Sequence, residues 1–179
     1  MAVRFVRTEL PGAWVIEPEF VSDERGAFAR TWCCREFAEH GLNPALVQCN
    51  VSINRLKGTV RGMHFQRAPH AEAKLVRCTR GTILDVIVDL RGDSPTFRRW
   101  ITCELSDENH RLLYIPEGLA HGFQTLTDHS EVHYQMSHEY HPDSAGGVRW
   151  NDPAINIQWP LAIASISDRD RSWPDLGAG

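Results

Sequence analysis

Short segments rich in β-branched residues, separated by turn residues, constrain the fold of this chain more than any other feature. Residues 74–79 and 82–90 flank Arg80-Gly81, and we predict that these two segments pair as a hairpin. Further segments of this kind lie at residues 101–105, 111–115, 122–127 and 130–137. Strands at such regular spacing are typical of an all-β barrel or sandwich.

A single short helix is predicted near the N-terminus, over about residues 33–41. Phe37 and Ala38 give this segment an apolar face, and Gly41 suits the residue that follows a helix. The 179 residues suffice for one compact domain, so we predict a single domain over 1–179. The tail after Trp173 is expected to be loose.

Charge and cysteine content narrow the classes of partner and compartment. A net charge of -4 and a pI of about 6.1 argue against nucleic-acid binding by the whole surface. The five cysteines form an odd set without a CxxC pair, which favours a reducing compartment over a disulfide framework. No apolar run has the length of a signal peptide or a membrane span, so we expect a cytoplasmic protein with no membrane partner.

Two histidines raise the question of a metal site. Pro116-x-Gly118-x-x-His121 resembles the second motif of the cupin superfamily, whose first motif normally supplies His-x-His and then a glutamate. The corresponding stretch here has one histidine, His64, with Glu72 eight residues further on. These three residues, His64, Glu72 and His121, would form the 2-His-1-carboxylate set of a metal-dependent oxygenase or isomerase. The missing histidine and a nearby arginine, Arg61, disfavour a cation there.

Strand alternation places the candidate side chains on faces. In residues 60–66 it predicts that Arg61, Met63 and Phe65 share one face, with Gly62, His64 and Gln66 on the other. In residues 130–137 it groups Tyr134 with Val132 and Met136. A mainly apolar interior that holds a histidine and a tyrosine suits proton transfer, because electrostatic interactions are stronger where water is excluded and they shift pKa values. The alternative is that both are ordinary buried residues with satisfied hydrogen bonds.

Ten motifs in order carry a family resemblance that runs from about residue 10 to residue 175. They are DERGAF (23–28), VQCNVSIN (47–54), VRGMHFQ (60–66), AKLVRC (73–78), DVIVDLR (85–91), SPTF (94–97), IPEGLAHGF (115–123), EVHYQMSHEY (131–140), WNDPAINIQWP (150–160) and SDRD (167–170). The chain thereby resembles the nucleotide-sugar epimerases typified by dTDP-4-dehydrorhamnose 3,5-epimerase. The resemblance implies a cupin-like jelly roll, or double-stranded β-helix barrel, in a homodimer that shares strands. It also implies that no metal or other cofactor takes part.

The resemblance implies an isomerase that removes and returns protons beside the C4 ketone of a nucleotide-linked 4-keto-6-deoxyhexose. His64 matches the family's base, and Asp170 matches the carboxylate that orients it, with Asp168 as the fallback. Lys74 matches the lysine that stabilises negative charge on the C4 oxygen. Tyr134 matches the acid on the opposite face. The joint presence of these residues argues against a non-catalytic sugar-nucleotide binder.

Seven more positions match residues that bind substrate in the family. They are Arg25, Gln48, Asn50 and Arg61 for the diphosphate or sugar, Phe28 beside the base, and His121 and Tyr140 in the sugar pocket. One departure concerns the nucleotide, because Arg30 replaces the glutamate that accepts a hydrogen bond from thymine. Arginine has no acceptor, so a CDP or GDP sugar becomes an alternative to dTDP. The sequence leaves open whether C3, C5 or both are inverted.

Overall fold

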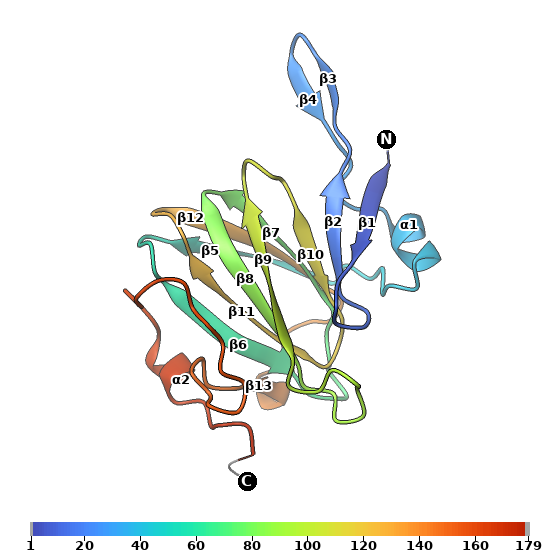
Figure 1. The fold of residues 1–179 in the computed structure, drawn as a ribbon. Coiled ribbons are helices and arrows are strands. Elements are labelled where there is room, and N and C mark those ends of the chain that lie inside the picture. The colour runs from blue at the N-terminus through green and yellow to red at the C-terminus, as the bar shows by residue number, and fades with distance from the viewer. Residues whose placement is uncertain (1, 178–179) are drawn as a thin grey trace.

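The computed structural model describes residues 2–177, and its strands form two large sheets and one small hairpin (Figure 1). The six-stranded sheet has the order β1 (Val3–Arg7), β2 (Trp14–Pro18), β10 (Leu112–Ile115), β7 (Lys74–Arg80), β12 (Ser130–Met136) and β5 (Gln48–Asn54). The five-stranded sheet has the order β13 (Ala145–Gly147), β6 (Val60–Gln66), β11 (Leu119–Thr125), β8 (Thr82–Asp89) and β9 (Trp100–Ser106). The fold is therefore mostly β, and the two sheets stay open instead of closing into a barrel.

Helix is confined to short segments in the described part of the chain. Helix α1 (Cys34–Glu39) lies within the predicted range and buries Phe37. Helix α2 (Asp168–Arg171) is a single turn that the sequence analysis did not anticipate, and a 3-10 turn covers Pro142–Ser144. No helix among residues 2–177 has the length and apolar character needed to cross a membrane.

The predicted hairpin of β7 and β8 is wrong, although both strands exist. Strand β7 pairs with β10 and β12 in one sheet, whereas β8 pairs with β9 and β11 in the other. Gly81, with a positive φ of 73°, turns the chain between the sheets, and its N–H donates to Asp107 Oδ2 at 2.9 Å. A β-branched pattern identifies a strand, but the strand's partner depends on contacts distant in sequence.

The core lies between the two sheets. It combines inward side chains of the six-stranded sheet, such as Val76, Leu113 and Val132, with Ile87 and Phe123 of the five-stranded sheet. The C-terminal segment covers the outer face of the five-stranded sheet, and α1 covers the part of the other outer face that β1, β2 and β10 form. Because both of its faces are covered, β8 is buried along nearly its whole length.

The C-terminal segment is attached to the body of the protein, which corrects the expectation of a loose tail. Leu176 packs in the cluster on the outer face of the five-stranded sheet, and its N–H donates to Asp152. Arg149 forms an ion pair with Asp175 at 2.7 Å. Residues 178–179 lie outside the described part of the chain.

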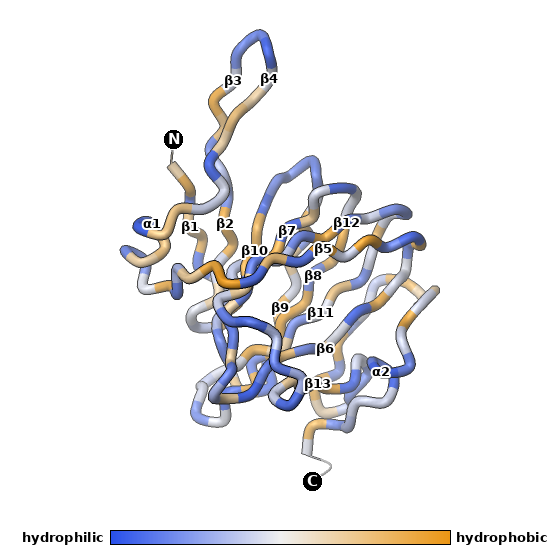
Figure 2. Tube along the Cα trace, turned by 180° about the vertical axis from the view of Figure 1, so that it is seen from behind, coloured by the Kyte–Doolittle hydropathy of each residue, from blue (hydrophilic) through white to orange (hydrophobic). Residues whose placement is uncertain are grey.

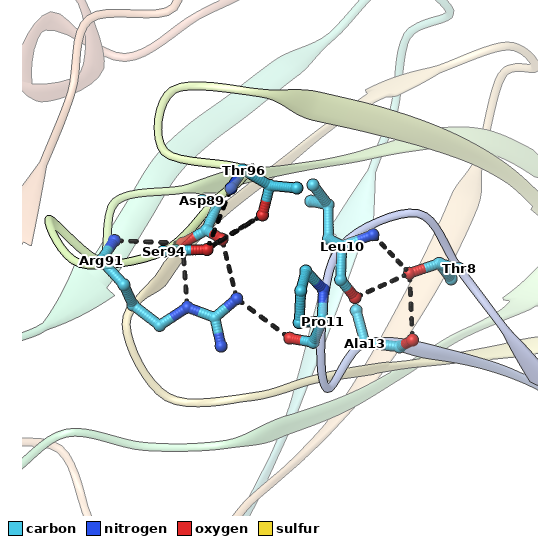
Figure 3. A network of polar contacts seen from close by, with 8 residues as sticks. All are labelled: Thr8, Leu10, Pro11, Ala13, Asp89, Arg91, Ser94 and Thr96. Atoms are coloured by element: carbon cyan, nitrogen blue, oxygen red, sulfur yellow. Dashed lines mark hydrogen bonds and ion pairs between the residues drawn. The ribbon is translucent and has the colours of Figure 1, made fainter.

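A polar network ties the loop after β8 to the turn between β1 and β2 (Figure 3). The buried Asp89 carboxylate accepts hydrogen bonds from Arg91 Nη2 at 2.7 Å and from the hydroxyls of Ser94 and Thr96, each at 2.6 Å. Arg91 also donates to Pro11 O at 2.9 Å. Desolvation raises the pKa of Asp89, but the hydrogen bonds from Arg91, Ser94 and Thr96 outweigh it and hold this pKa below its usual value.

We expect Asp89→Asn to lower the free energy of unfolding by about 3 kcal/mol at neutral pH, because it leaves Arg91 without its buried anionic partner. The folded-state pKa of Asp89 lies below the unfolded value. Its contribution is therefore present above about pH 4 and lost as the pH falls through the folded pKa. Urea unfolding across pH 3–7 measures this difference. The control is Asp93→Asn, an exposed carboxylate in the same loop, and an equal effect in both variants would contradict the account.

The hairpin of β3 (Val21–Asp23) and β4 (Gly26–Phe28) projects away from both large sheets (Figure 1). Figure 2 shows hydrophilic residues at its tip. Its stem carries apolar side chains in water, with Val21 61% and Phe28 66% exposed.

Candidate active site

A pocket of about 320 Å³ lies between the two sheets, within the size range of small-molecule sites. Strands β5, β7 and β12 contribute its lining from one sheet, and β6 and β11 contribute from the other. The predicted site residues that line it are Gln48, Asn50, Arg61, His64, Lys74, His121, Tyr134 and Tyr140. The fold thus brings together most of the residues singled out from the sequence.

His64 on β6 is held by a carboxylate from α2. His64 Nε2 lies 2.6 Å from Asp170 Oδ1, and Asp170 Oδ2 accepts a hydrogen bond from the Gly62 N–H at 3.2 Å. Ser167 caps α2 by accepting from the Asp170 N–H at 3.1 Å, which fixes the position of the carboxylate. Asp168, the fallback position, is exposed and forms no hydrogen bond with His64.

The charge of Asp170 determines which histidine nitrogen is free to accept a proton. Desolvation raises the pKa of Asp170, but the hydrogen bond and charge of His64 outweigh it, so this pKa stays below its usual value. An ionised carboxylate can only accept hydrogen bonds, so Nε2 of neutral His64 carries the hydrogen. Nδ1 then keeps its lone pair. His64 is 43% exposed, against 5% for Asp170, so the imidazole remains accessible.

Lys74 on β7 places a buried positive charge in the pocket. Its ammonium donates to the backbone oxygen of His64 at 3.2 Å and pairs with Glu72 Oε1 at 3.1 Å. Both side chains are about nine-tenths buried, at 11% and 9% exposure. A fixed ammonium in such surroundings stabilises negative charge on a bound oxygen more strongly than it would in water.

Tyr134 on β12 lies beside a second buried histidine–carboxylate pair. Its ring is steeply inclined to that of His121, at 74°, with centroids 5.9 Å apart. His121 Nε2 lies 2.6 Å from Asp85 Oδ1, and both residues are buried. Burial, followed by the charge of Asp85, raises the pKa of Tyr134 far above its ordinary value. Tyr134 therefore keeps its proton at any physiological pH and can act as a donor.

The metal-ligand set of His64, Glu72 and His121 does not assemble. Each of these side chains already pairs with another group, namely Asp170, Lys74 and Asp85. Among residues 2–177 the three are not grouped at metal-ligand spacing; a different histidine cluster is. The arrangement of this pocket therefore favours a proton-transfer site over a metal centre.

Arg61 lines the same pocket as His64, which corrects the predicted separation of their faces. The pairing of β6 with β11 shifts register between His121 and Phe123, so strict alternation fails there. Arg61 Nε donates to Asn54 Oδ1 at 2.7 Å, which orients its guanidinium. Met63 follows the expectation of an opposite face and packs in the outer cluster of the five-stranded sheet, and Phe65 packs against that cluster while also lining the pocket.

Arg25 and Phe28 are not in the pocket of their own chain. Both lie on the projecting β3–β4 hairpin, where Arg25 forms an ion pair with Asp23 at 2.5 Å and Phe28 is exposed. Arg30, just after the hairpin, pairs with Glu36 Oε1 of α1 at 2.6 Å. The sequence resemblance carries no information on which subunit's pocket a projecting residue serves.

Several lining residues were missed as binding groups in the sequence analysis. They are Val51, Ser52, Phe65, Gln66, Glu72, Phe123, Met136 and Arg169. A signal existed for two of them. Arg169 lies within the SDRD motif, and a guanidinium suits diphosphate oxygens. Gln66 follows His64 by two residues in the VRGMHFQ motif.

Comparison with known proteins finds relatives over nearly the whole chain. The family model described as dTDP-4-dehydrorhamnose 3,5-epimerase matches residues 7–178. A protein of that name from Methanothermobacter thermautotrophicus is 47% identical over 176 residues, or 97% of this chain and 94% of the relative. The Bacillus anthracis dTDP-4-dehydrorhamnose 3,5-epimerase, crystallised with TDP and PPi bound, has a TM-score of 0.94 at 42% identity. That match covers 98% of this chain and 100% of the other.

A third relative has a narrower activity in its title. It is a 3'-monoepimerase from Streptomyces bikiniensis in complex with dTDP-quinovose, with a TM-score of 0.88 and 34% identity over 95% of this chain and 86% of that chain. Fold, pocket and relatives together define an epimerase, which is an enzyme of the isomerase class. The chain belongs to the dTDP-4-dehydrorhamnose 3,5-epimerase family.

Proposed function

We propose that this protein is a metal-independent epimerase that inverts C3, C5 or both in a 4-keto-6-deoxyhexose carried on a nucleoside diphosphate. One observation carries the proposal. The His64–Asp170 pair, the buried Lys74 ammonium and the protonated Tyr134 phenol all belong to one pocket or directly contact it. These are the base, the charge stabiliser and the acid that an enolate mechanism needs.

The first step is removal of a proton from the carbon beside the C4 ketone. His64 Nδ1 takes this proton, while Asp170 accepts a hydrogen bond from Nε2 and stabilises the imidazolium that forms. The electron pair moves onto the C4 oxygen, where the Lys74 ammonium stabilises the enolate. Tyr134 then donates its proton to the opposite face of the same carbon, which inverts the configuration. The phenolate recovers a proton from solvent, and His64 releases its own.

The nucleotide diphosphate binds at the polar part of the pocket in this proposal. Arg61 and Arg169 supply guanidinium groups, and Gln48 and Asn50 on β5 supply amides. The relatives' names support thymidine as the base, since each refers to dTDP or to bound TDP. Arg30 lacks the acceptor that thymine would require. Either other residues recognise the thymine base, or the nucleotide that carries the sugar has a different base.

The proposed assembly is a homodimer with a cupin-like jelly roll in each subunit. Successive strands from β5 to β8 alternate between the two sheets, as jelly-roll connections do. The projecting β3–β4 hairpin would place Arg25 and Phe28 against the partner subunit's pocket. Its exposed apolar stem supports that arrangement, as do the exposed Val51 and Ile53 of the edge strand β5.

The test of this function is turnover of 4-keto-6-deoxyglucose linked to dTDP, CDP or GDP, with a chelator present throughout. We expect epimerised product from the dTDP sugar, identified by NMR from the coupling constants of the sugar ring. If turnover of the CDP or GDP sugar exceeds that of the dTDP sugar by tenfold or more, that nucleotide is the one the protein uses. Lack of epimerisation with all three carriers, or turnover that returns only on addition of a metal, would contradict the proposal.

A further inference from the structure

A cluster of three histidines lies beside the pocket and takes no part in the chemistry described above. His70 lies in the turn after β6, His138 follows β12, and His141 precedes the 3-10 turn at 142–144. One ring nitrogen from each comes within 4.8 Å of the others. His70 Nδ1 and His138 Nε2 are 3.5 Å apart, and all three side chains are half-buried.

The backbone that carries this cluster is held by one buried side chain. The Gln66 amide donates to His70 O at 2.9 Å and to Glu139 O at 3.1 Å. Its Oε1 accepts from the His141 N–H at 2.6 Å. Gln66 is only 5% exposed, so the turn after β6 and the segment after β12 are fixed to each other without help from the imidazoles. A scaffold of this kind brings ligands together before any ion binds.

We propose that His70, His138 and His141 bind one divalent transition-metal ion of the zinc or nickel type, at a site separate from the proton-transfer residues. Imidazole suits zinc, copper and nickel, whereas magnesium and calcium require oxygen ligands. Metal–nitrogen distances of about 2.0–2.1 Å place tetrahedral ligand atoms about 3.4 Å apart. The His70–His138 spacing already approaches that value.

Closing the site requires only side-chain rotation. The rings of His70 and His141 are stacked, with centroids 3.5 Å apart and planes 12° from parallel. Rotation about χ2, a broad torsion in histidine, turns their nitrogens toward a common point. His138 is oriented for this role, because its Nδ1 lies 3.1 Å from Glu139 O. That hydrogen bond places the proton on Nδ1 and leaves Nε2 free to coordinate.

The position of the site gives the ion a structural effect. Tyr140, between two of the proposed ligands, lines the pocket, and its N–H donates to Gln48 Oε1 at 3.0 Å. An ion on the three imidazoles would therefore hold residues 138–141 at the rim of the pocket. Since the ion binds the folded chain, it should raise thermal stability by mass action.

Calorimetric titration of the chelator-treated, dialysed protein with Zn²⁺, and separately with Mg²⁺, tests this inference. We expect one Zn²⁺ per chain, no measurable Mg²⁺ binding, and a higher melting temperature in Zn²⁺. His138→Ala and His141→Ala should each weaken Zn²⁺ binding at least tenfold. Circular dichroism of the metal-free variants verifies their folding.

Two matched variants distinguish this cluster from other histidines. His129→Asn changes an exposed histidine in a turn with a φ of 55°, which asparagine tolerates, and should bind Zn²⁺ like the unmodified chain. His64→Asn removes the proposed base from the pocket and should also retain binding. Absence of Zn²⁺ binding, binding unchanged in His138→Ala and His141→Ala, or binding lost in His64→Asn would overturn the proposal.

Discussion

Replacing His64 with asparagine should abolish the exchange of sugar protons for solvent deuterium at both C3 and C5. A general base typically contributes 10²–10⁴-fold to the rate, and we expect the loss of turnover to fall in that range. The asparagine amide cannot act as a base, although it can still hydrogen-bond to Asp170, whose carboxylate lies opposite Nε2 of His64. NMR of the sugar in deuterated water measures exchange and turnover together.

The matched control for this variant is His129→Asn, the same chemical change at an exposed turn outside the pocket. It should exchange deuterium at the rate of the unmodified chain. Substantial exchange at either carbon in folded His64→Asn would show that another residue is the base. His121 would then be the next candidate in the pocket, because it too is paired with a carboxylate, Asp85.

Tyr134→Phe should separate the two halves of the reaction. The phenol delivers a proton to the enolate face opposite His64, but His64 does not need it in order to remove one. The variant should therefore incorporate deuterium into the sugar with retained configuration. The rate of inversion should fall by roughly 10²-fold or more, which is the loss expected when one general acid is removed. Removing the hydroxyl leaves the aromatic ring in place, so packing against His121 should persist.

Tyr140→Phe is the matched control for Tyr134→Phe, because both tyrosines line the pocket and differ in burial. Tyr140 is half exposed, at 50%, and we expect its variant to lose little inversion. Product configuration and deuterium content at each carbon are read from the same NMR spectra. If Tyr140→Phe loses inversion and Tyr134→Phe keeps it, Tyr140 is the acid.

Strand positions could be predicted from local sequence, but strand partners could not. The segment at 82–90 matches β8 within one residue, because an apolar, β-branched run between turn residues is a local signal. Its pairing with β9 and β11 instead of β7 depends on contacts between distant parts of the chain. The corner at Gly81 has the composition of a hairpin turn, yet it crosses between sheets.

The predicted positions of site residues are wrong where a strand is irregular or where the residues lie on the projecting β3–β4 hairpin. Alternation predicts that Arg61 lies on the face opposite His64 because it assumes a regular strand, and the register shift in the β6–β11 pairing breaks that assumption. Arg25 and Phe28 match family positions, but their location on the β3–β4 hairpin appears only in three dimensions. Asp170 matches the family's carboxylate, with Asp168 as the alternative if the register shifts, and the structure places Asp170 beside His64.

Deuterium incorporation by the unmodified protein tests the central claim most directly. The protein is incubated in deuterated water with 4-keto-6-deoxyglucose linked to dTDP, and the configuration and deuterium content of C3 and C5 are read by NMR. Proton transfer through an enolate predicts that every inverted carbon carries solvent deuterium, with a chelator present. An inverted carbon that retains its original hydrogen would contradict the account, because inversion through an enolate removes that hydrogen and replaces it with one that Tyr134 has exchanged with solvent.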